Sequence, residues 1–158
     1  MNHCESGPFD VVIEVPRWGF VKRGSNNNVD FISPLPCPYN YGSIPTYVGL
    51  DGDLLDAVVL GPRLARGTTL NLRAFAVIGL TDRGLYDDKL ICSDRPLTKF
   101  DRCLVLNFFH LYAAFKRLLN FIRRRRGPTF CEGWRDVDGA IARARPSNDD
   151  WDGTTIVF

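Results

Sequence analysis

Residues 51–80 of this 158-residue chain read DGDLLDAVVLGPRLARGTTLNLRAFAVIGL. Two apolar runs in this stretch, Leu54 to Leu60 and Thr69 to Leu80, predict β-strands because they are rich in valine, leucine and other strand formers. Gly61-Pro62 and Arg66-Gly67 lie between the runs and are typical of turns. The stretch therefore predicts a pair of strands at the centre of the fold, with an acidic segment directly before the first.

Further strands are predicted on both sides of this pair. Phe9 to Pro16 is β-branched and ends at a proline, and Val29 to Ile32 is a short strand candidate. Lys89 to Cys92 is predicted as the last short strand, after Gly84. Ser33 to Pro38 carries three prolines at alternate positions, which indicates an irregular, rigid connection.

A helical period begins after residue 98. Apolar residues at helical spacing predict a long amphipathic helix; they are Leu104, Phe108, Leu111, Phe115, Leu118 and Ile122. Thr98 and Asp101 have the spacing of a capping box at the start of this helix, and Gly127-Pro128 ends it. A shorter helix is expected over Asp136 to Ala144, and Thr154 to Phe158 is expected to be extended.

The order of these elements indicates the fold class. Strands followed by helices predict an α+β fold, and a small closed β-barrel is the natural way to remove sheet edges. A chain of 158 residues is long enough for one domain with its own core, so we expect a single domain over residues 1–158.

The composition excludes several classes of protein. With 20 basic and 18 acidic residues, the net charge of +2 creates no field that would attract nucleic acid or a membrane surface. The N-terminus lacks a signal pattern and no stretch approaches the ~20 apolar residues of a membrane span, which predicts a soluble, cytoplasmic protein. Five cysteines without Cys-x-x-Cys spacing argue against disulfides and structural zinc and favour reduced thiols.

Carboxylates crowd the start of the central strand pair. Asp51, Asp53 and Asp56 lie within six residues, directly before an apolar run. Two carboxylates ~4 Å apart repel by roughly 4 kcal/mol at an effective dielectric of 20. A hard divalent cation such as Mg²⁺ is the usual way to neutralise such a cluster.

A second acidic group follows at Asp82, Asp87 and Asp88. Aspartate is common in turns, and for one such cluster alone solvated turn residues would be the better interpretation. Two clusters, one of them beside a core strand, favour a metal site that both of them face.

A series of motifs, in order along residues 9–145, resembles those of the soluble (family I) inorganic pyrophosphatases. The motifs are Val11-Val12-Ile13-Glu14-Val15-Pro16, Val21-Lys22, Pro38-Tyr39-Asn40-Tyr41-Gly42, Asp51-Gly52-Asp53-x-x-Asp56, the loop with Asp82, Asp87 and Lys89, Phe108-Phe109-x-x-Tyr112, and Glu132-Gly133-Trp134. Each motif is weak alone, but their common order is specific.

The resemblance implies an OB-like β-barrel with helices packed outside it, and Mg²⁺-dependent hydrolysis of pyrophosphate to two phosphates. The residues that it implies as Mg²⁺ ligands are Asp51, Asp56, Asp82 and Asp87, with Glu14 acting through water in the outer metal shell. Asp53 would be the general base toward a metal-bridging water. The residues that would hold phosphate oxygens are Lys22, Tyr41, Lys89 and Tyr112. Family members often form oligomers, so a homo-oligomer is also expected.

Three positions depart from the family pattern. Leu54 replaces the proline of the signature, and Phe31 and Ala113 stand at or near the positions of an arginine and a lysine that hold the leaving phosphate. Lys116, Arg23 and Arg83 are candidate replacements, but a solvated surface charge is the simpler interpretation of each. The run from Arg123 to Arg126 is interpreted as a solvated helix end with a favourable dipole interaction, rather than as a polyanion site.

Two alternatives to a working pyrophosphatase stay open. The chain could hydrolyse another phosphoanhydride whose leaving group is not a bare phosphate. It could also be a barrel protein that binds metal or anions with little turnover. Asp53 favours the enzymatic interpretations, because a general base is useful for activating water and is not needed for binding.

Overall fold

Five strands form a closed barrel. They are β1 (Ser6–Val15), β4 (Asn40–Val48), β5 (Leu54–Val59), β6 (Thr69–Asp82) and β8 (Lys89–Ser93). Their order is β1-β4-β5-β8-β6, and the pairing of β6 with β1 closes the ring. Only the β5–β8 pairing is parallel among these five strands. The computed structural model describes residues 6–19, 21–23, 28–32 and 35–147, without the side chains of residues 6, 23 and 30–32.

The strands predicted within the described residues are present, but β4 was not predicted from the sequence. The extended segment expected over Thr154 to Phe158 lies outside the described residues. The β4 segment contains Gly42 and Pro45, and both residue types are unfavourable inside strands. In the barrel, Pro45 lies where the β4–β5 register shifts, between Ile44 and Val48. At Gly42, a Cβ atom would lie 2.1 Å from the carbonyl oxygen of Val12, so only glycine allows β1 to approach.

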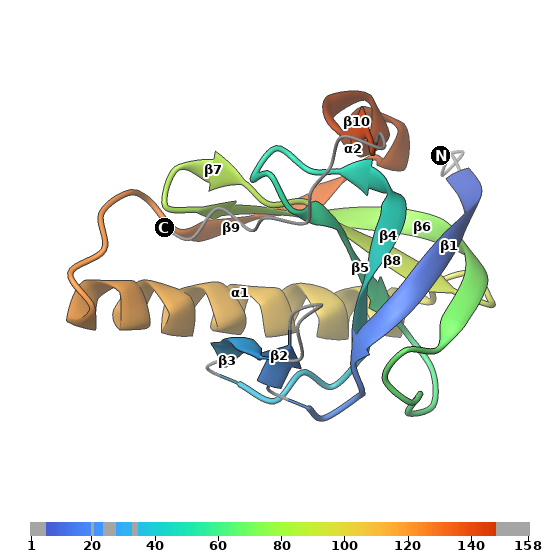
Figure 1. The fold of residues 1–158 in the computed structure, drawn as a ribbon, viewed down its shortest axis with the longest axis horizontal. Coiled ribbons are helices and arrows are strands. Elements are labelled where there is room, and N and C mark those ends of the chain that lie inside the picture. Colours follow the sequence, from blue (N-terminus) through green and yellow to red (C-terminus); the bar gives the residue numbers. More distant parts are fainter. Residues whose placement is uncertain (1–5, 20, 24–27, 33–34, 148–158) are drawn as a thin grey trace.

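The strand β6 is long enough to leave the barrel. Its second half pairs with β7 (Leu85–Tyr86) and with β9 (Phe130–Arg135), neither of which was predicted. β2 (Val21–Arg23) and β3 (Val29–Ile32) form a separate hairpin, and β10 (Arg145–Pro146) pairs with β4. Figure 1 shows β7 and β9 as an extension of the barrel above the long helix.

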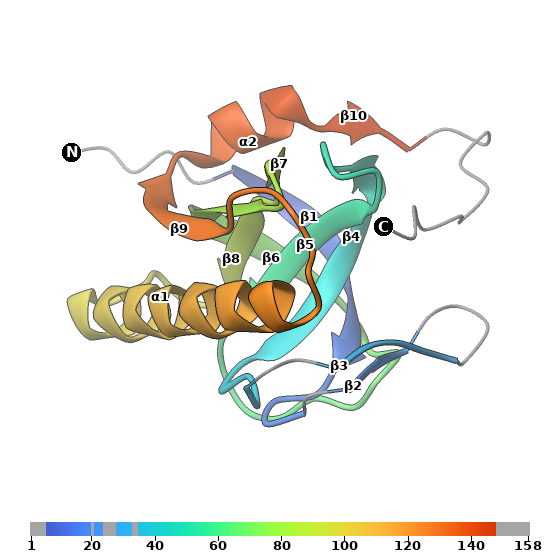
Figure 2. The ribbon, with the colours of Figure 1, turned by 90° about the vertical axis from the view of Figure 1, so that its left-hand side faces the viewer.

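Both predicted helices are present, and the first begins with the predicted cap. α1 spans Lys99–Ile122 and begins with the capping box of Thr98 and Asp101. α2 spans Val137–Arg143 and is capped by Asp136, whose side chain accepts a hydrogen bond from the backbone of Gly139. Figures 1 and 2 show the two helices on different sides of the barrel, which agrees with the expected barrel and flanking helices.

The core consists of two clusters, and each helix contributes to one of them. Val137 and Ala140 of α2 pack with the residues inside the barrel, among them Ile13. Val105 and Phe109 of α1 pack against outward-facing residues of the strands. The acidic loops after β4 and β6 line one pocket together with Ala140 and Arg143 of α2.

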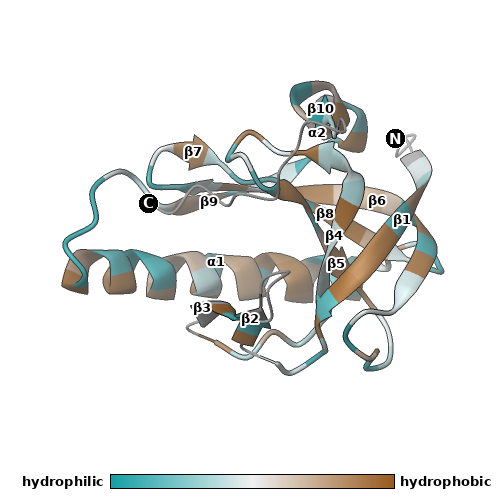
Figure 3. Ribbon diagram, viewed as in Figure 1, coloured by the Kyte–Doolittle hydropathy of each residue, from teal (hydrophilic) through white to brown (hydrophobic). Residues whose placement is uncertain are grey.

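The outer face of α1 is apolar and exposed. Its large exposed side chains are Phe100, Leu104, Leu111, Phe115, Leu118, Phe121 and Ile122. Figure 3 shows this hydrophobic colouring along the edge of α1 that lies away from β9. Among the described residues, no helix combines the length and the hydrophobicity that a membrane crossing requires.

Candidate functional site: an acidic cluster with buried lysines

Lys89 lies at the centre of the site, at the start of β8. Its Nζ donates hydrogen bonds to Asp56 Oδ2 at 2.7 Å, to the hydroxyl of Tyr41 at 2.7 Å and to Asp87 Oδ1 at 3.0 Å. Asp56 and Lys89 come together because parallel β5 and β8 place them as register partners. Burial alone would raise the pKa of Asp56, but Lys89 and Lys22 outweigh it and lower this pKa. The central carboxylate is therefore ionised over the whole neutral range.

Asp51 and Asp53 lie on the turn between β4 and β5. The Asp53 N–H donates to Asp51 Oδ1 at 3.2 Å, and the Gly49 N–H donates to the Asp53 carbonyl at 2.7 Å, which fixes the turn. Burial, and then repulsion from Asp87 and Asp56, raises the pKa of Asp51 to about 7. Asp51 thus adds negative charge that the nearby lysines do not fully compensate.

Lys22 and Glu14 approach the same cluster from β2 and β1. Lys22 Nζ lies 3.3 Å from Glu14 Oε2 and 5.9 Å from the centre of the Tyr41 ring. Burial opposes the charge of Lys22, but Asp56 and then Glu14 outweigh it and raise the pKa of Lys22. Glu14 Oε2 is buried and accepts no hydrogen bond from the described residues.

Asp82 is separate from this cluster and is held from α1. Lys116 Nζ lies 2.6 Å from Asp82 Oδ2, and Oδ1 accepts hydrogen bonds from Asn120 Nδ2 at 3.2 Å and Thr129 Oγ1 at 3.1 Å. Lys116 also lies 5.7 Å from the centre of the Tyr112 ring. The side chain of Lys116 is only 16% exposed, so its interpretation as a solvated surface charge was wrong.

The three aspartates of the second acidic group face three different partners. Asp87 contacts Lys89, and Asp82 contacts Lys116. Asp88 Oδ2 accepts hydrogen bonds from Arg143 of α2, at 2.8 Å from Nη2 and 3.2 Å from Nε. Asp87 and Asp88 line one pocket with Asp51 and Asp56, so the two acidic groups do face one site, and Asp88 also joins the barrel to α2.

Of the two positions where the family has a cation, the structure describes the side chain of Ala113 but not that of Phe31. Ala113 is 4% exposed and packs in the core cluster of α1, so its side chain does not face the site. Lys116, one helical turn after Tyr112, is the residue that does. The backbone of Phe31 pairs with Lys22 in the β2–β3 hairpin, but the Phe31 side chain lies outside the described residues.

The donor set fits a divalent cation at one part of the site. Asp51, Asp56 and Asp87 line one pocket and offer the oxygen atoms that Mg²⁺ prefers. The raised pKa of Asp51 indicates that their charges are not balanced. In the part of the chain that the structure describes, no three His, Cys, Asp or Glu side chains are already arranged as a metal cage.

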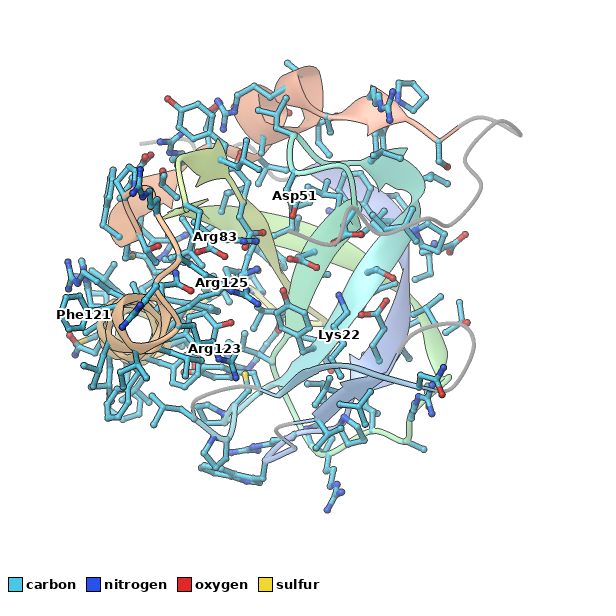
Figure 4. All side chains as sticks on the ribbon, turned by 60° about the vertical axis from the view of Figure 1, so that its left-hand side comes forward. Lys22, Asp51, Arg83, Phe121, Arg123 and Arg125 are labelled. Atoms are coloured by element: carbon cyan, nitrogen blue, oxygen red, sulfur yellow. The ribbon has the colours of Figure 1, made fainter. Side chains whose placement is uncertain are left out.

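Arginines lie at the rim of the site. Figure 4 shows Arg83, Arg123 and Arg125 on the side of α1 that faces the barrel, across from Lys22 and Asp51, whereas Phe121 lies on the opposite side of the helix. The loop after α1 packs on the loop of Arg83, because the Arg83 N–H donates to Thr129 Oγ1 at 3.3 Å. The residues from Arg123 to Arg126 are all exposed, as expected.

Of four residues around the site, sequence reasoning missed Asn120, Thr129 and Arg143, and it interpreted Lys116 as a solvated surface charge. A usable signal existed for two of them. Tyr112, Lys116 and Asn120 are spaced four residues apart, which places them along one face of a helix. Thr129 and Arg143 reach the site only through the tertiary arrangement of the loop after α1 and of α2.

Comparisons with known proteins identify the family of this chain. The family model described as inorganic pyrophosphatase matches residues 11–141. A soluble inorganic pyrophosphatase of rice (Oryza sativa) is 35% identical over 110 residues, which cover 60% of this chain and 51% of the relative. The chain thus spans about half the length of the rice protein, but an inorganic pyrophosphatase of Neisseria meningitidis matches at 27% identity over 93% of this chain and 90% of that protein.

A solved structure supports the same assignment. The crystal structure of an inorganic pyrophosphatase from Neisseria gonorrhoeae aligns with a TM-score of 0.66 and 26% identity, covering 87% of this chain and 91% of that one. The two proteins therefore share their fold over most of the length of this chain. With a family model that spans both the acidic turn and the helix of Tyr112, the chain belongs to the inorganic pyrophosphatase family.

Proposed function

We propose that this protein hydrolyses inorganic pyrophosphate to two phosphates in a Mg²⁺-dependent reaction. The observation that carries the proposal is the hydrogen-bonded group of Lys89, Asp56, Asp87 and Tyr41, in which the ionised carboxylate of Asp56 and a second carboxyl group meet a buried cation at the mouth of the barrel. Phosphoanhydride hydrolysis needs mainly positioning and charge neutralisation, and this group supplies both.

The residues of this chain have separate tasks in the proposed reaction. Lys22 and Lys89 would neutralise phosphate oxygens, and the hydroxyls of Tyr41 and Tyr112 would orient them. Asp53 would accept a proton from the attacking water while the water oxygen forms a bond to phosphorus and the bridging P–O bond breaks. The negative charge of that bond passes to the leaving phosphate.

The proposed metal ligands are Asp51, Asp56 and Asp87, with Glu14 acting through water. A bound Mg²⁺ lowers the pKa of a coordinated water and neutralises phosphate charge. The buried Oε2 of Glu14, which accepts no hydrogen bond from the described residues, is free to receive one from such a water. Asp82 does not fit this set, because it does not line the pocket of Asp51, Asp56 and Asp87, and its oxygens are held by Lys116, Asn120 and Thr129.

A second candidate is a longer phosphoanhydride, such as an inorganic polyphosphate or a nucleoside triphosphate. The observation that favours it is the position of Arg83, Arg123 and Arg125, which lie on the side of α1 facing the site. One guanidinium group can bind two oxygens of a phosphate group at once. These arginines would contact the phosphate groups of a longer substrate that lie beyond its first two.

The exposed apolar face of α1 supports a homo-oligomer of this chain. Leu104, Leu111 and Leu118 are exposed and spaced seven residues apart, which is the spacing of helices that pack along each other. We also propose a cytoplasmic location, supported by the four described cysteines, which are free thiols.

Phosphate release from the purified protein tests the proposed function. Pyrophosphate, tripolyphosphate and ATP are compared at equal concentration with Mg²⁺ and with EDTA. We expect Mg²⁺-dependent release that is fastest from pyrophosphate. Preference for tripolyphosphate or ATP would favour the second candidate, and no release from any of them would leave a metal- or anion-binding protein.

A further inference from the structure

Asp82 is a predicted metal ligand whose two carboxylate oxygens are held by three different side chains. Its Oδ2 contacts Lys116 Nζ at 2.6 Å, and its Oδ1 accepts from Asn120 and Thr129. The donors come from two elements, α1 and the loop that follows it. Asn120 also donates to Thr129 Oγ1 at 3.1 Å, so the donors hold each other.

These contacts are inside the protein and not at its surface. Asn120 is 7% and Thr129 is 6% exposed, and the side chains of Lys116 and Asp82 are 16% and 18% exposed. Tyr112, Lys116 and Asn120 follow one face of α1 at four-residue spacing. The capped helix therefore fixes the ammonium group against the end of β6, and Lys116 has little freedom to leave.

The surroundings of Asp82 differ from those of Asp51. Asp51 accepts one backbone hydrogen bond, from Asp53, and faces other carboxylates in the pocket. A divalent cation beside Asp51 would relieve repulsion, whereas one beside Asp82 would meet the ammonium of Lys116 and would have to displace it.

We propose that Lys116 is a built-in cation that takes the place of a metal ion at Asp82. This chain would then bind divalent cations at Asp51, Asp56 and Asp87 only, and the charge at the end of β6 would come from α1. The inference rests on the proposed function only for the metal requirement, since it concerns how many ions bind and not how fast any substrate reacts.

The number of Mn²⁺ ions bound per chain tests this inference, measured by equilibrium dialysis and by electron paramagnetic resonance on the intact protein without substrate. In Asp82→Asn we expect the same number of ions and a change in affinity of less than about twofold. In Lys116→Met we expect one additional Mn²⁺ per chain, because the carboxylate loses its cation. The double variant Lys116→Met/Asp82→Asn should lose that additional ion again.

Two controls keep the result interpretable. Lys99→Met removes an exposed lysine from the first turn of the same helix and should leave the number of ions unchanged. Far-UV circular dichroism verifies that each variant is folded, and Asp82→Asn tests the inference by itself if Lys116→Met does not fold. A lower ion number in Asp82→Asn, or no additional ion in folded Lys116→Met, would overturn the inference. A protein that releases no phosphate could still give the expected numbers, so failure of the proposed function is distinguishable.

Discussion

Lys89 Nζ lies 2.7 Å from Asp56 Oδ2, and the two side chains are only 3% and 10% exposed. Parallel pairing of β5 with β8 puts the two residues opposite each other, so the backbone of the barrel holds this contact. The same ammonium also contacts Tyr41 and Asp87. One lysine thus contacts a carboxylate on one strand, a carboxyl group on a loop and a hydroxyl on a second strand, and it links the fold to the site.

Lys89→Met should destabilise the protein strongly. It leaves Asp56 and Asp87 buried without their cation, and breaking a buried pair from one side costs about 3–5 kcal/mol. Urea unfolding at pH 7 with EDTA measures this loss, and Lys99→Met, at an exposed position, should stay within about 0.5 kcal/mol of the unmodified protein. Because Lys89 lowers the pKa of Asp56, the stabilisation is present above the unfolded pKa of about 3.9 and is lost as the pH falls further. If Lys89→Met destabilised the protein as much at acidic pH as at pH 7, this result would contradict the ion pair.

Asp51→Asn should stabilise the metal-free protein near pH 8. The pKa of Asp51 is raised to about 7 in the folded state, so the folded protein binds a proton that the unfolded chain loses at lower pH. The stability of the unmodified protein should therefore decrease as the pH rises from 4 to 7, and Asp51→Asn should remove this decrease. Each pKa unit corresponds to about 1.4 kcal/mol, and solvent at the rim reduces the total, so we expect a gain of about 1–2 kcal/mol.

Mg²⁺ should reverse the order of stability at pH 8, so that the unmodified protein becomes more stable than Asp51→Asn. At about 100 times the dissociation constant, a ligand of the folded state adds about 2.7 kcal/mol. The unmodified protein should gain this at pH 8 and little at pH 5, because Asp51 must be deprotonated to bind the ion. Melting temperatures with and without Mg²⁺ measure the gain, and Asp51→Asn/Asp56→Asn should lose most of it. A melting temperature of the unmodified protein that ignores Mg²⁺ at pH 8 would exclude the metal site.

Asp53→Asn should reduce turnover more than it reduces metal binding. A general base contributes typically about 10²–10⁴-fold in rate, whereas Asn keeps the size of the side chain and the backbone contacts of the turn. Phosphate release gives kcat, and Mn²⁺ titration gives the affinity. Asp94→Asn, at an exposed position, is the control. Equal losses in rate and affinity would identify Asp53 as a metal ligand instead.

Ala113→Lys should destabilise the protein and should not improve pyrophosphate hydrolysis. The family pattern suggested that a lysine here would restore a missing cation, but Ala113 is buried in the core cluster of α1. Burying an unpaired ammonium there should cost several kcal/mol. His110→Lys, at an exposed position of the same helix, should be nearly neutral. Unchanged stability of Ala113→Lys together with a higher kcat/KM would contradict the structure at this position.

Leu111→Glu combined with Leu118→Glu should dissociate the proposed homo-oligomer. Both leucines are exposed on α1, so the change should leave the monomer folded while charges enter the contact. Light scattering coupled to size exclusion gives the molar mass. Arg117→Glu, also exposed on α1, is the matched control and should keep the assembly. A monomeric unmodified protein would reject the proposed homo-oligomer.

The sequence by itself determined the local elements of this protein. β5, β6, α1 and α2 were predictable because hydrophobic period, capping residues and turn residues act within a few positions of each other. The acidic turn before β5 was also visible, since charge crowding is a local property. β4 and β9 were not predictable, because Pro45 in β4 and Gly133 in β9 are tolerated only at specific places in the sheet.

Only the tertiary structure decided which charges compensate one another. Asp56 and Lys89 are 33 residues apart, Asp82 and Lys116 come from different elements, and Asp88 turns toward Arg143. The sequence grouped Asp82, Asp87 and Asp88 as one cluster, whereas the barrel sends each to its own cation. The energy of a charge depends on distance and burial, and both are set by how strands and helices pack, not by spacing along the chain.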